Sequence, residues 1–156
     1  MLYLLVRLGS DSYAIEAGAV RRILPFARLK ILPSDLPAIA GVLNFHGQAV
    51  PVLDLTLLLT GAISRERLGT RIILADIALA SGSVRPLGLL AEGAHSVARF
   101  AEGDFQPAGA TPRGRTWLGP VAEHSGQLVQ RIEIARLLPA EVLEALTNDS
   151  ATALPT

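Results

Sequence analysis

The chain has 156 residues, half of them hydrophobic and 18% charged, and its formal net charge is zero. A zero net charge provides no field for attracting nucleic acid or an anionic membrane, and the absence of cysteine excludes disulfides and thiolate metal sites. The length suits one domain, no run reaches the ~18 apolar residues of a membrane span, and the start lacks a signal peptide, so we expect a cytoplasmic protein without direct membrane insertion.

Short apolar runs separated by turn residues dominate the first part of the chain. They predict the following segments: strands at 2–8 and 13–15, a turn or short helix at 19–24, a strand at 28–32 and a loop at 33–37. The helical prediction rests on Ala19, Val20, Ile23 and Leu24, which recur at helical spacing before Pro25.

The segment Ile39–Leu55 predicts a strand, a tight turn and a longer strand. Asn44–Gly47 has Asn first and Gly fourth, as a type I turn prefers, and the Asn side chain can cap local amides. The second strand is apolar on both faces and should be covered on both sides. Pro51 lacks an amide hydrogen, so it should lie at a sheet edge or bulge, and Asp54 could cap a helical turn over residues 55–59.

This segment has an echo in the second half of the chain. Gly47–Leu59 aligns with Gly126–Leu138 at one constant offset, sharing Gly, Gln, Val, an acid and two final Leu. Gly41 aligns with Gly119 if one residue is added. The acids that match, Asp54 and Glu133, suggest structural caps rather than a catalytic pair. We expect two related β-rich halves, joined by the polar connection 61–69.

The second half repeats the pattern of the first. We expect strands at 71–79 and 84–91, a short helical stretch at 92–100, a surface loop at 103–115, a hairpin at 117–122 and 126–134, a helix at 139–146 and a frayed tail at 148–156. The helical stretch carries Val97 and Phe100, and the final helix would turn Val142, Leu143 and Leu146 to one face. Many short strands favour small barrels or a sandwich, and we favour two half-barrels in one domain.

The sequence offers little catalytic chemistry. None of the three histidines pairs with another at helical spacing, and no Gly-x-Ser-x-Gly segment occurs, although a triad could still assemble in space. Gly109–Thr116 has the spacing of a phosphate-binding P-loop, but Arg115 replaces the lysine and Pro112 removes an amide hydrogen. The residues therefore do not support an enzyme.

Surface recognition remains. The hairpin tip should expose Phe45 and His46, unless Phe45 folds back onto the core, and Trp117 is either an interface anchor or a core residue. The high apolar content has the same two interpretations: the apolar residues either face partners or fill a tightly packed core.

Ile39–Leu55 resembles the signature of CheW-like chemotaxis coupling proteins, roughly I-x-G-x-x-N-x-R-G-x-x-x-P-V-x-D-L. Tyr13–Ile15 followed by Val20–Ile23 resembles the family's Y-x-I and V-x-E-I motifs, and Gly88–Val97 resembles G-L-x-V-D-x-V-x-x-V. The likeness extends over residues 2–146.

The resemblance implies a mainly β fold, in which two SH3-like five-stranded β-barrel subdomains share one core, with short helices and a C-terminal helix. It implies one domain over residues 1–147, with interleaved halves at roughly 1–65 and 66–147, and a flexible tail at 148–156.

It also implies a non-enzymatic adaptor of bacterial two-component signalling, with no cofactor and no metal. Such a protein bridges the cytoplasmic tip of a chemoreceptor to the regulatory domain of a histidine kinase, and is recruited to membrane receptor arrays. The receptor tip would lie in the groove between subdomains, and the kinase domain on subdomain ends. The implied partner-binding residues are Val20, Arg22, Ile39, Gly41, Asn44, Phe45, His46, Gly47 and Val97, and the structural ones are Pro51, Asp54 and Gly126.

The chain departs from the family pattern at three positions. The family usually has Arg at the position of His46, often Glu at that of Arg22, and often Arg at that of Thr56. Such charge changes should alter partner choice, which suggests an alternative chemosensory pathway rather than the flagellar one. Two other classes of function stay open: a β-barrel sensor that holds an apolar metabolite between the halves, and an unrecognised hydrolase.

Overall fold

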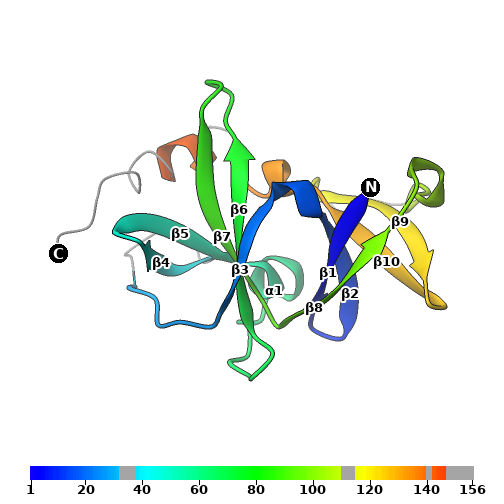
Figure 1. Cartoon of the computed structure of the whole chain (residues 1–156), viewed down its shortest axis with the longest axis horizontal. Helices are drawn as coiled ribbons and strands as arrows, with labels where there is room; N and C mark the ends of the chain where they lie inside the picture. The colour runs from blue at the N-terminus through cyan, green and yellow to red at the C-terminus, as the bar shows by residue number, and fades with distance from the viewer. Residues whose placement is uncertain (32–37, 110–114, 140–141, 147–156) are drawn as a thin grey trace.

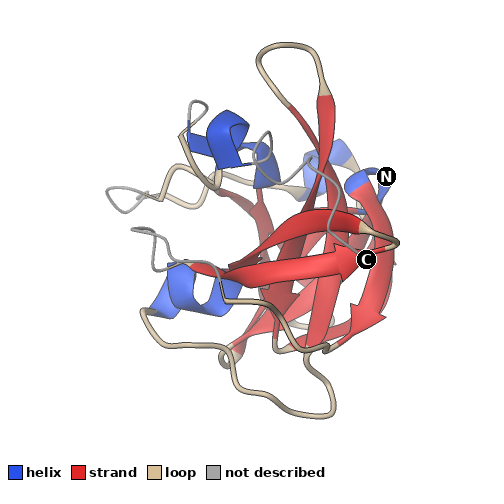
Figure 2. Cartoon of the chain, turned by 90° about the vertical axis from the view of Figure 1, so that its left-hand side faces the viewer, coloured by secondary structure: helices blue, strands red, loops and turns tan. Residues whose placement is uncertain are grey.

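The computed structural model describes residues 1–31, 38–109, 115–139 and 142–146. For His95 it describes the backbone alone. Strands make up most of this part of the chain (Figure 2). The helical elements are short: α1 (Leu55–Thr60), a helical segment at 142–146, and 3-10 turns at Ala17–Ala19, Glu102–Asp104 and Ile134–Arg136. No helix among the described residues is long and apolar enough to cross a membrane.

Two five-stranded sheets form the architecture (Figure 1). Sheet A has the order β8-β1-β2-β10-β9, with β1 (Leu2–Leu8), β2 (Asp11–Glu16), β8 (Gly93–Arg99), β9 (Leu118–His124) and β10 (Gln127–Ile132). Sheet B has the order β3-β6-β7-β5-β4, with β3 (Val20–Pro25), β4 (Ile39–Phe45), β5 (Gln48–Asp54), β6 (Arg71–Ala78) and β7 (Val84–Ala91).

The two sheets share one plan. Each pairs a hairpin, β1-β2 or β6-β7, in parallel with the second strand of another hairpin, β10 or β5. The register shifts at equivalent places, between Leu5 and Val6 opposite β8 and between Val20 and Arg22 in β3. The chain crosses between the sheets, because β3 follows β2 but belongs to sheet B, and β8 follows β7 but belongs to sheet A. The echo in the sequence therefore corresponds to equivalent positions of two sheets.

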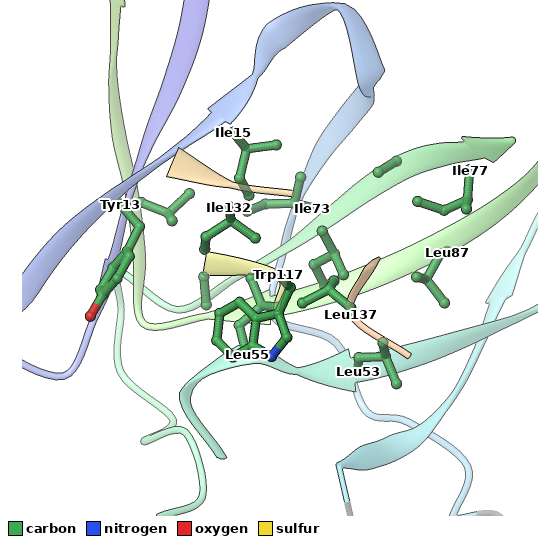
Figure 3. Close-up of a cluster of buried hydrophobic side chains, with 14 of the residues drawn as sticks. Tyr13, Ile15, Leu53, Leu55, Ile73, Ile77, Leu87, Trp117, Ile132 and Leu137 are labelled. Carbon is green, nitrogen blue, oxygen red and sulfur yellow. The ribbon is translucent and has the colours of Figure 1, made fainter. Parts of the chain in front are cut away.

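Alternation along the strands divides the buried side chains into three clusters. The central cluster lies between the sheets and includes Leu4, Val6, Ile15, Leu53, Leu55, Ile73, Leu87, Trp117 and Ile132 (Figure 3). Inner cluster A lies on the other face of sheet A and includes Tyr3, Leu5, Ala14, Phe100, Ala122 and Val129. Inner cluster B lies on the other face of sheet B and includes Leu43, Val50, Val52, Ile72, Leu74 and Leu90. The expected fold of two β-subdomains around a shared core is confirmed.

Several predicted elements are confirmed in this arrangement. β5 is apolar on both faces, and Leu53 faces the central cluster while Val50 and Val52 face inner cluster B. Trp117 is buried in the central cluster, so the core interpretation holds for it. Residues 142–146 are helical and pack on the central cluster, as the shared apolar face predicts. The predicted loop 33–37, the tail 148–156 and most of the P-loop-like segment lie outside the described residues.

Three secondary-structure predictions are wrong. The segments 19–24 and 92–100, predicted helical, lie mostly in the strands β3 and β8, and only Ala19 belongs to a 3-10 turn. Pairing with β6 and β1 decides the structure of short apolar runs that fit either period. Pro25 ends β3 at a sheet edge. Lys30 makes only an isolated bridge to Val42, so the described residues 28–31 form no strand.

The edge or bulge expected for Pro51 is also wrong, because β5 lies between β7 and β4. Pro51 pairs with Val42, whose backbone N–H and C=O both bond to Lys30 instead, at 2.8 and 2.9 Å. The parallel pairing of β5 with β7 begins one residue later, at Val52. Pro51 is tolerated in an interior strand because it stands where no ladder hydrogen bond to β4 is lost.

Asp54 caps α1, as predicted. Its Oδ1 accepts a hydrogen bond from the Leu57 N–H at 3.1 Å, and the Ser64 side chain and backbone N–H donate to its two oxygens at 2.6 and 2.9 Å. The cap predicted for Glu133 is wrong: its side chain accepts from Arg131 Nε at 2.8 Å and does not bond the following turn. The longer Glu side chain reaches back to Arg131, whereas buried Asp54 binds the amides ahead of it.

Candidate partner-binding surface

The tip of the β4-β5 hairpin is a two-residue turn. Phe45 pairs with Gln48, and both residues between them have positive φ, 52° at His46 and 83° at Gly47. Two positive φ angles are typical of a type I′ hairpin turn, so the predicted type I turn is wrong. The predicted Asn cap is confirmed, because Asn44 Oδ1 accepts a hydrogen bond from the Gly47 N–H at 2.9 Å.

Phe45 is half-buried against inner cluster B and lies between two polar neighbours. The His46 ring centroid is 4.3 Å from that of Phe45, and the Arg22 guanidinium carbon lies 5.7 Å from the Phe45 ring centroid. Arg22 belongs to β3, at the opposite edge of sheet B from β4, so this contact joins the two edges of the curled sheet. A cation over an exposed ring contributes about 0.5–1 kcal/mol. Phe45 therefore packs partly onto the core, as the fold-back alternative predicts, and exposes the rest of its side chain at the hairpin tip.

The other residues singled out from the sequence are dispersed. Val20 and Ile39 are half-buried against the central cluster. Gly41 is buried, and a Cβ there would lie 2.7 Å from the backbone oxygen of Lys30, so close strand packing requires glycine. Val97 lies on β8 with 57% of its surface exposed, and among the described residues no recorded contact joins it to the hairpin tip.

One exposed apolar residue was missed by the sequence reasoning. Ile23 pairs with Ile73, and Val97 pairs with Leu4, so both side chains lie on the face that carries the central cluster. Ile23 is 41% exposed and occupies on β3 the place that Val97 occupies on β8. The helical interpretation hid this equivalence. Simple strand alternation would also have placed Ile23 on the face opposite Val20, because only the register shift between Val20 and Arg22 brings both side chains to one face. Exposed apolar positions on the edge strands of both sheets thus extend the central cluster to the surface.

A cavity of about 470 Å³ lies beside sheet B. Its apolar lining includes Phe26, Leu29, Ile39, Leu57, Ile63 and Leu90. Asp54 also borders it, but both carboxylate oxygens accept hydrogen bonds from Leu57 and Ser64, which leaves this acid in a structural role. No group of three or more metal-ligating side chains occurs in the part of the chain that the structure describes.

Comparison with known proteins agrees with this geometry. A family model described as a CheW-like domain matches residues 2–142. A protein named chemotaxis protein CheW from Rhizobium meliloti (strain 1021) is 23% identical over 141 residues, covering 89% of this chain and 88% of its own. The crystal structure of the scaffolding protein TtCheW from Thermoanaerobacter tengcongensis superposes with a TM-score of 0.74 at 20% identity, covering 88% of this chain and 87% of its own. With the family model covering most of its length, the chain belongs to the CheW-like family.

Proposed function

We propose that this protein is a non-enzymatic scaffold of chemotaxis that couples chemoreceptors to a CheA-type histidine kinase on the cytoplasmic side of the membrane. The observation that carries the proposal is the CheW-like match over residues 2–142. The likeness to a relative named for chemotaxis and to a solved scaffolding protein supports it.

The edge strands β3 and β8 offer the receptor an apolar surface. Val20, Ile23 and Val97 lie on the face of the central cluster, and Ile23 and Val97 are exposed at its margin. A helical receptor tip that buries such side chains gains about 25 cal/mol per Å² of apolar surface. In this proposal the tip of the β4-β5 hairpin, with Asn44, Phe45 and His46, borders the same receptor, and the kinase domain docks at the ends of the sheets.

Partner choice would depend on the exposed departures from the family pattern. Arg22 and His46 are exposed and flank Phe45, so they can present charge to a partner. Thr56 is 3% exposed, so its difference from the family acts within the fold rather than on a partner. We propose that the two exposed changes direct this scaffold to receptors of a non-flagellar chemosensory pathway.

A matched pair of valines tests the receptor surface. Val97 and Val84 are both 57% exposed, but Val84 lies at the tip of the β6-β7 hairpin. In co-sedimentation of the full chain with receptor-bearing membranes and the kinase, Val97→Asp should reduce binding at least tenfold, whereas Val84→Asp should leave it unchanged. His46→Arg should change the preference within a panel of receptor tips.

Other outcomes would contradict the proposal. Wild-type protein that binds neither a receptor nor a kinase from its own organism would overturn the coupling role. If an apolar metabolite instead raises the melting temperature of the isolated protein, and Leu57→Trp in the cavity abolishes that rise, the sensor interpretation replaces it.

A further inference from the structure

Sheet A carries a polar layer at one end of its inner face. Inner cluster A comes from alternate residues that include Leu5, Ala14, Ala98, Ala122 and Val129. Two residues closer to one end of the sheet on each strand, the same alternation places polar side chains on this face: Arg7, Ser12, Ser96, His124 and Gln127. The registers pair Arg7 with Ser12, Ser96 with Leu5, and Gln127 with His124. Side chains from five strands therefore meet at one end of the curled sheet.

These side chains line a pocket of about 340 Å³ whose floor is Leu5 and Val129. Ser125, in the β9-β10 turn, completes the lining. Among the described residues, Arg7, His124 and the other polar lining side chains form no recorded hydrogen bond or ion pair with one another, and His124 contacts only the Phe100 ring, with centroids 5.7 Å apart. The pocket thus presents a guanidinium, an imidazole, three hydroxyls and an amide as free donors.

None of the described residues that line the pocket is an acid. The nearest acids along the chain, Asp11 and Glu123, precede Ser12 and His124 and so point to the opposite faces of their strands. Burial and the charge of Asp11 raise the pKa of Tyr13. Since Tyr13 lies in the central cluster, on that opposite face, this influence agrees with the direction of the Asp11 side chain. The side chains facing the pocket therefore carry only neutral or positive charge.

The equivalent end of sheet B shows that the fold does not require this polar layer. On the central hairpin of sheet B, Asp76 is equivalent to Arg7 and Pro86 is equivalent to Ser12. On the edge strands, Arg22 is equivalent to Ser96 and Phe45 is equivalent to His124. Asp76 pairs with Arg21 at 2.6 Å, and Phe45 covers inner cluster B beneath Arg22. An aromatic ring and an ion pair close one end, whereas unpaired donors surround a pocket at the other.

We propose that the pocket of sheet A binds a phosphate group. A phosphate offers at least three acceptor oxygens and matches a guanidinium supported by hydroxyls on several sides, whereas a carboxylate has two acceptor oxygens in one plane. The pocket is larger than the phosphate itself, so it also admits the small molecule or side chain that carries the group. This inference does not depend on the proposed function.

The test is a titration of the full ¹⁵N-labelled chain with sodium phosphate, O-phospho-L-serine or sodium acetate, each balanced with sodium chloride. Phosphate or phosphoserine should produce saturable shifts of the Ser96, Ser125 and Gln127 amides in the millimolar range. Tighter binding of phosphoserine than of inorganic phosphate would identify the source as a phosphorylated molecule, and the reverse would identify it as free phosphate.

Three variants connect the shifts to the pocket. Arg7→Gln should weaken binding at least tenfold, and His124→Phe, which copies the closed end of sheet B, should abolish it. Arg22→Gln removes one cation outside the pocket and should leave the affinity unchanged. Ser96→Ala replaces Arg7→Gln if that variant does not fold, and should weaken binding severalfold. Non-saturating shifts, equal affinity for acetate, or equal losses in Arg7→Gln and Arg22→Gln would overturn the proposal.

Discussion

Sheets A and B follow one backbone plan with different side chains, and the difference separates what the plan needs from what it tolerates. Both hairpins next to the parallel pairing end in two-residue turns with positive φ, at His46-Gly47 and at Ser125-Gly126. The turns and register shifts recur, whereas the caps, the close glycine contacts and the ends of the sheets differ. Backbone geometry is thus fixed by a few turn and bulge positions, and the remaining positions can change with function.

The largest difference is expected between Gly41 of β4 and Gly119 of β9, which both lie at the register shift of their hairpin, one position apart in the common register. A Cβ at Gly41 would lie 2.7 Å from the Lys30 backbone oxygen, which cannot move alone, and Gly41 has a φ of 154°. A Cβ at Gly119 would lie 3.0 Å from a Glu133 side-chain oxygen, which can rotate away. We expect Gly41→Ala to lower the free energy of unfolding by about 3 kcal/mol and Gly119→Ala by about 1 kcal/mol. Urea denaturation measures both, and equal losses would contradict this account of the two contacts.

Asp54, the last residue of β5, and Glu133, the residue after β10, should differ next. Asp54→Ala leaves the Leu57 N–H and the buried Ser64 donors without their acceptor, which should cost about 2–3 kcal/mol of stability. Glu133→Ala removes only a partly exposed pair with Arg131 and should cost less than about 1 kcal/mol. Chemical denaturation of both variants checks this order. A Glu133→Ala loss as large as that of Asp54→Ala would mean that the two acids are structurally equivalent after all.

The two hairpin turns, by contrast, should respond alike. Gly47 and Gly126 have φ angles of 83° and 78°, and neither has an atom within 4 Å of a Cβ position, so only backbone strain opposes a side chain there. Gly47→Ala and Gly126→Ala should each cost about 1 kcal/mol, with nearly equal shifts of the denaturation midpoint. Clearly different shifts would show that the turns are not equivalent.

The smallest effect concerns Tyr13, which occupies the place in β2 that Leu87 occupies in β7. Burial, reinforced by the charge of Asp11, raises the pKa of Tyr13 above 10.0. The folded state therefore holds this proton more tightly than the unfolded chain, so the contribution to stability is complete below about pH 10 and is lost as the pH rises further. Comparison of wild type with Tyr13→Phe at about pH 8 and pH 11 measures it. The wild type should lose more stability, and identical losses would contradict the prediction.

Local patterns in the sequence predicted most of the elements, and long-range pairing explains the errors. Asn44, Asp54 and the apolar faces of β5 act on neighbours in the chain, so their roles could be read directly. The strands β3 and β8 were missed because their partners, β6 and β1, lie about 50 and 90 residues away in the chain, and pairing overrides the local spacing of apolar residues.

The candidate surfaces were predictable only in part. Phe45 and His46 follow from the turn, but the approach of Arg22 depends on the curling of sheet B, which no local pattern encodes. The polar pocket of sheet A escaped notice because Arg7, Ser96 and His124 come from three distant segments. Once the offset between the halves and the strand registers are known, each polar residue of sheet A can be compared with its counterpart in sheet B.

The exchange of β3 and β8 has a consequence for the integrity of the molecule. Residues 1–60 supply two strands to sheet A and three to sheet B, and the later residues complete both sheets. After a protease cut within the connection 61–69, the two fragments should therefore stay associated through both sheets, and neither fragment alone should form a complete sheet. A reporter split at this connection would regain its structure only when both pieces are present in the same cell.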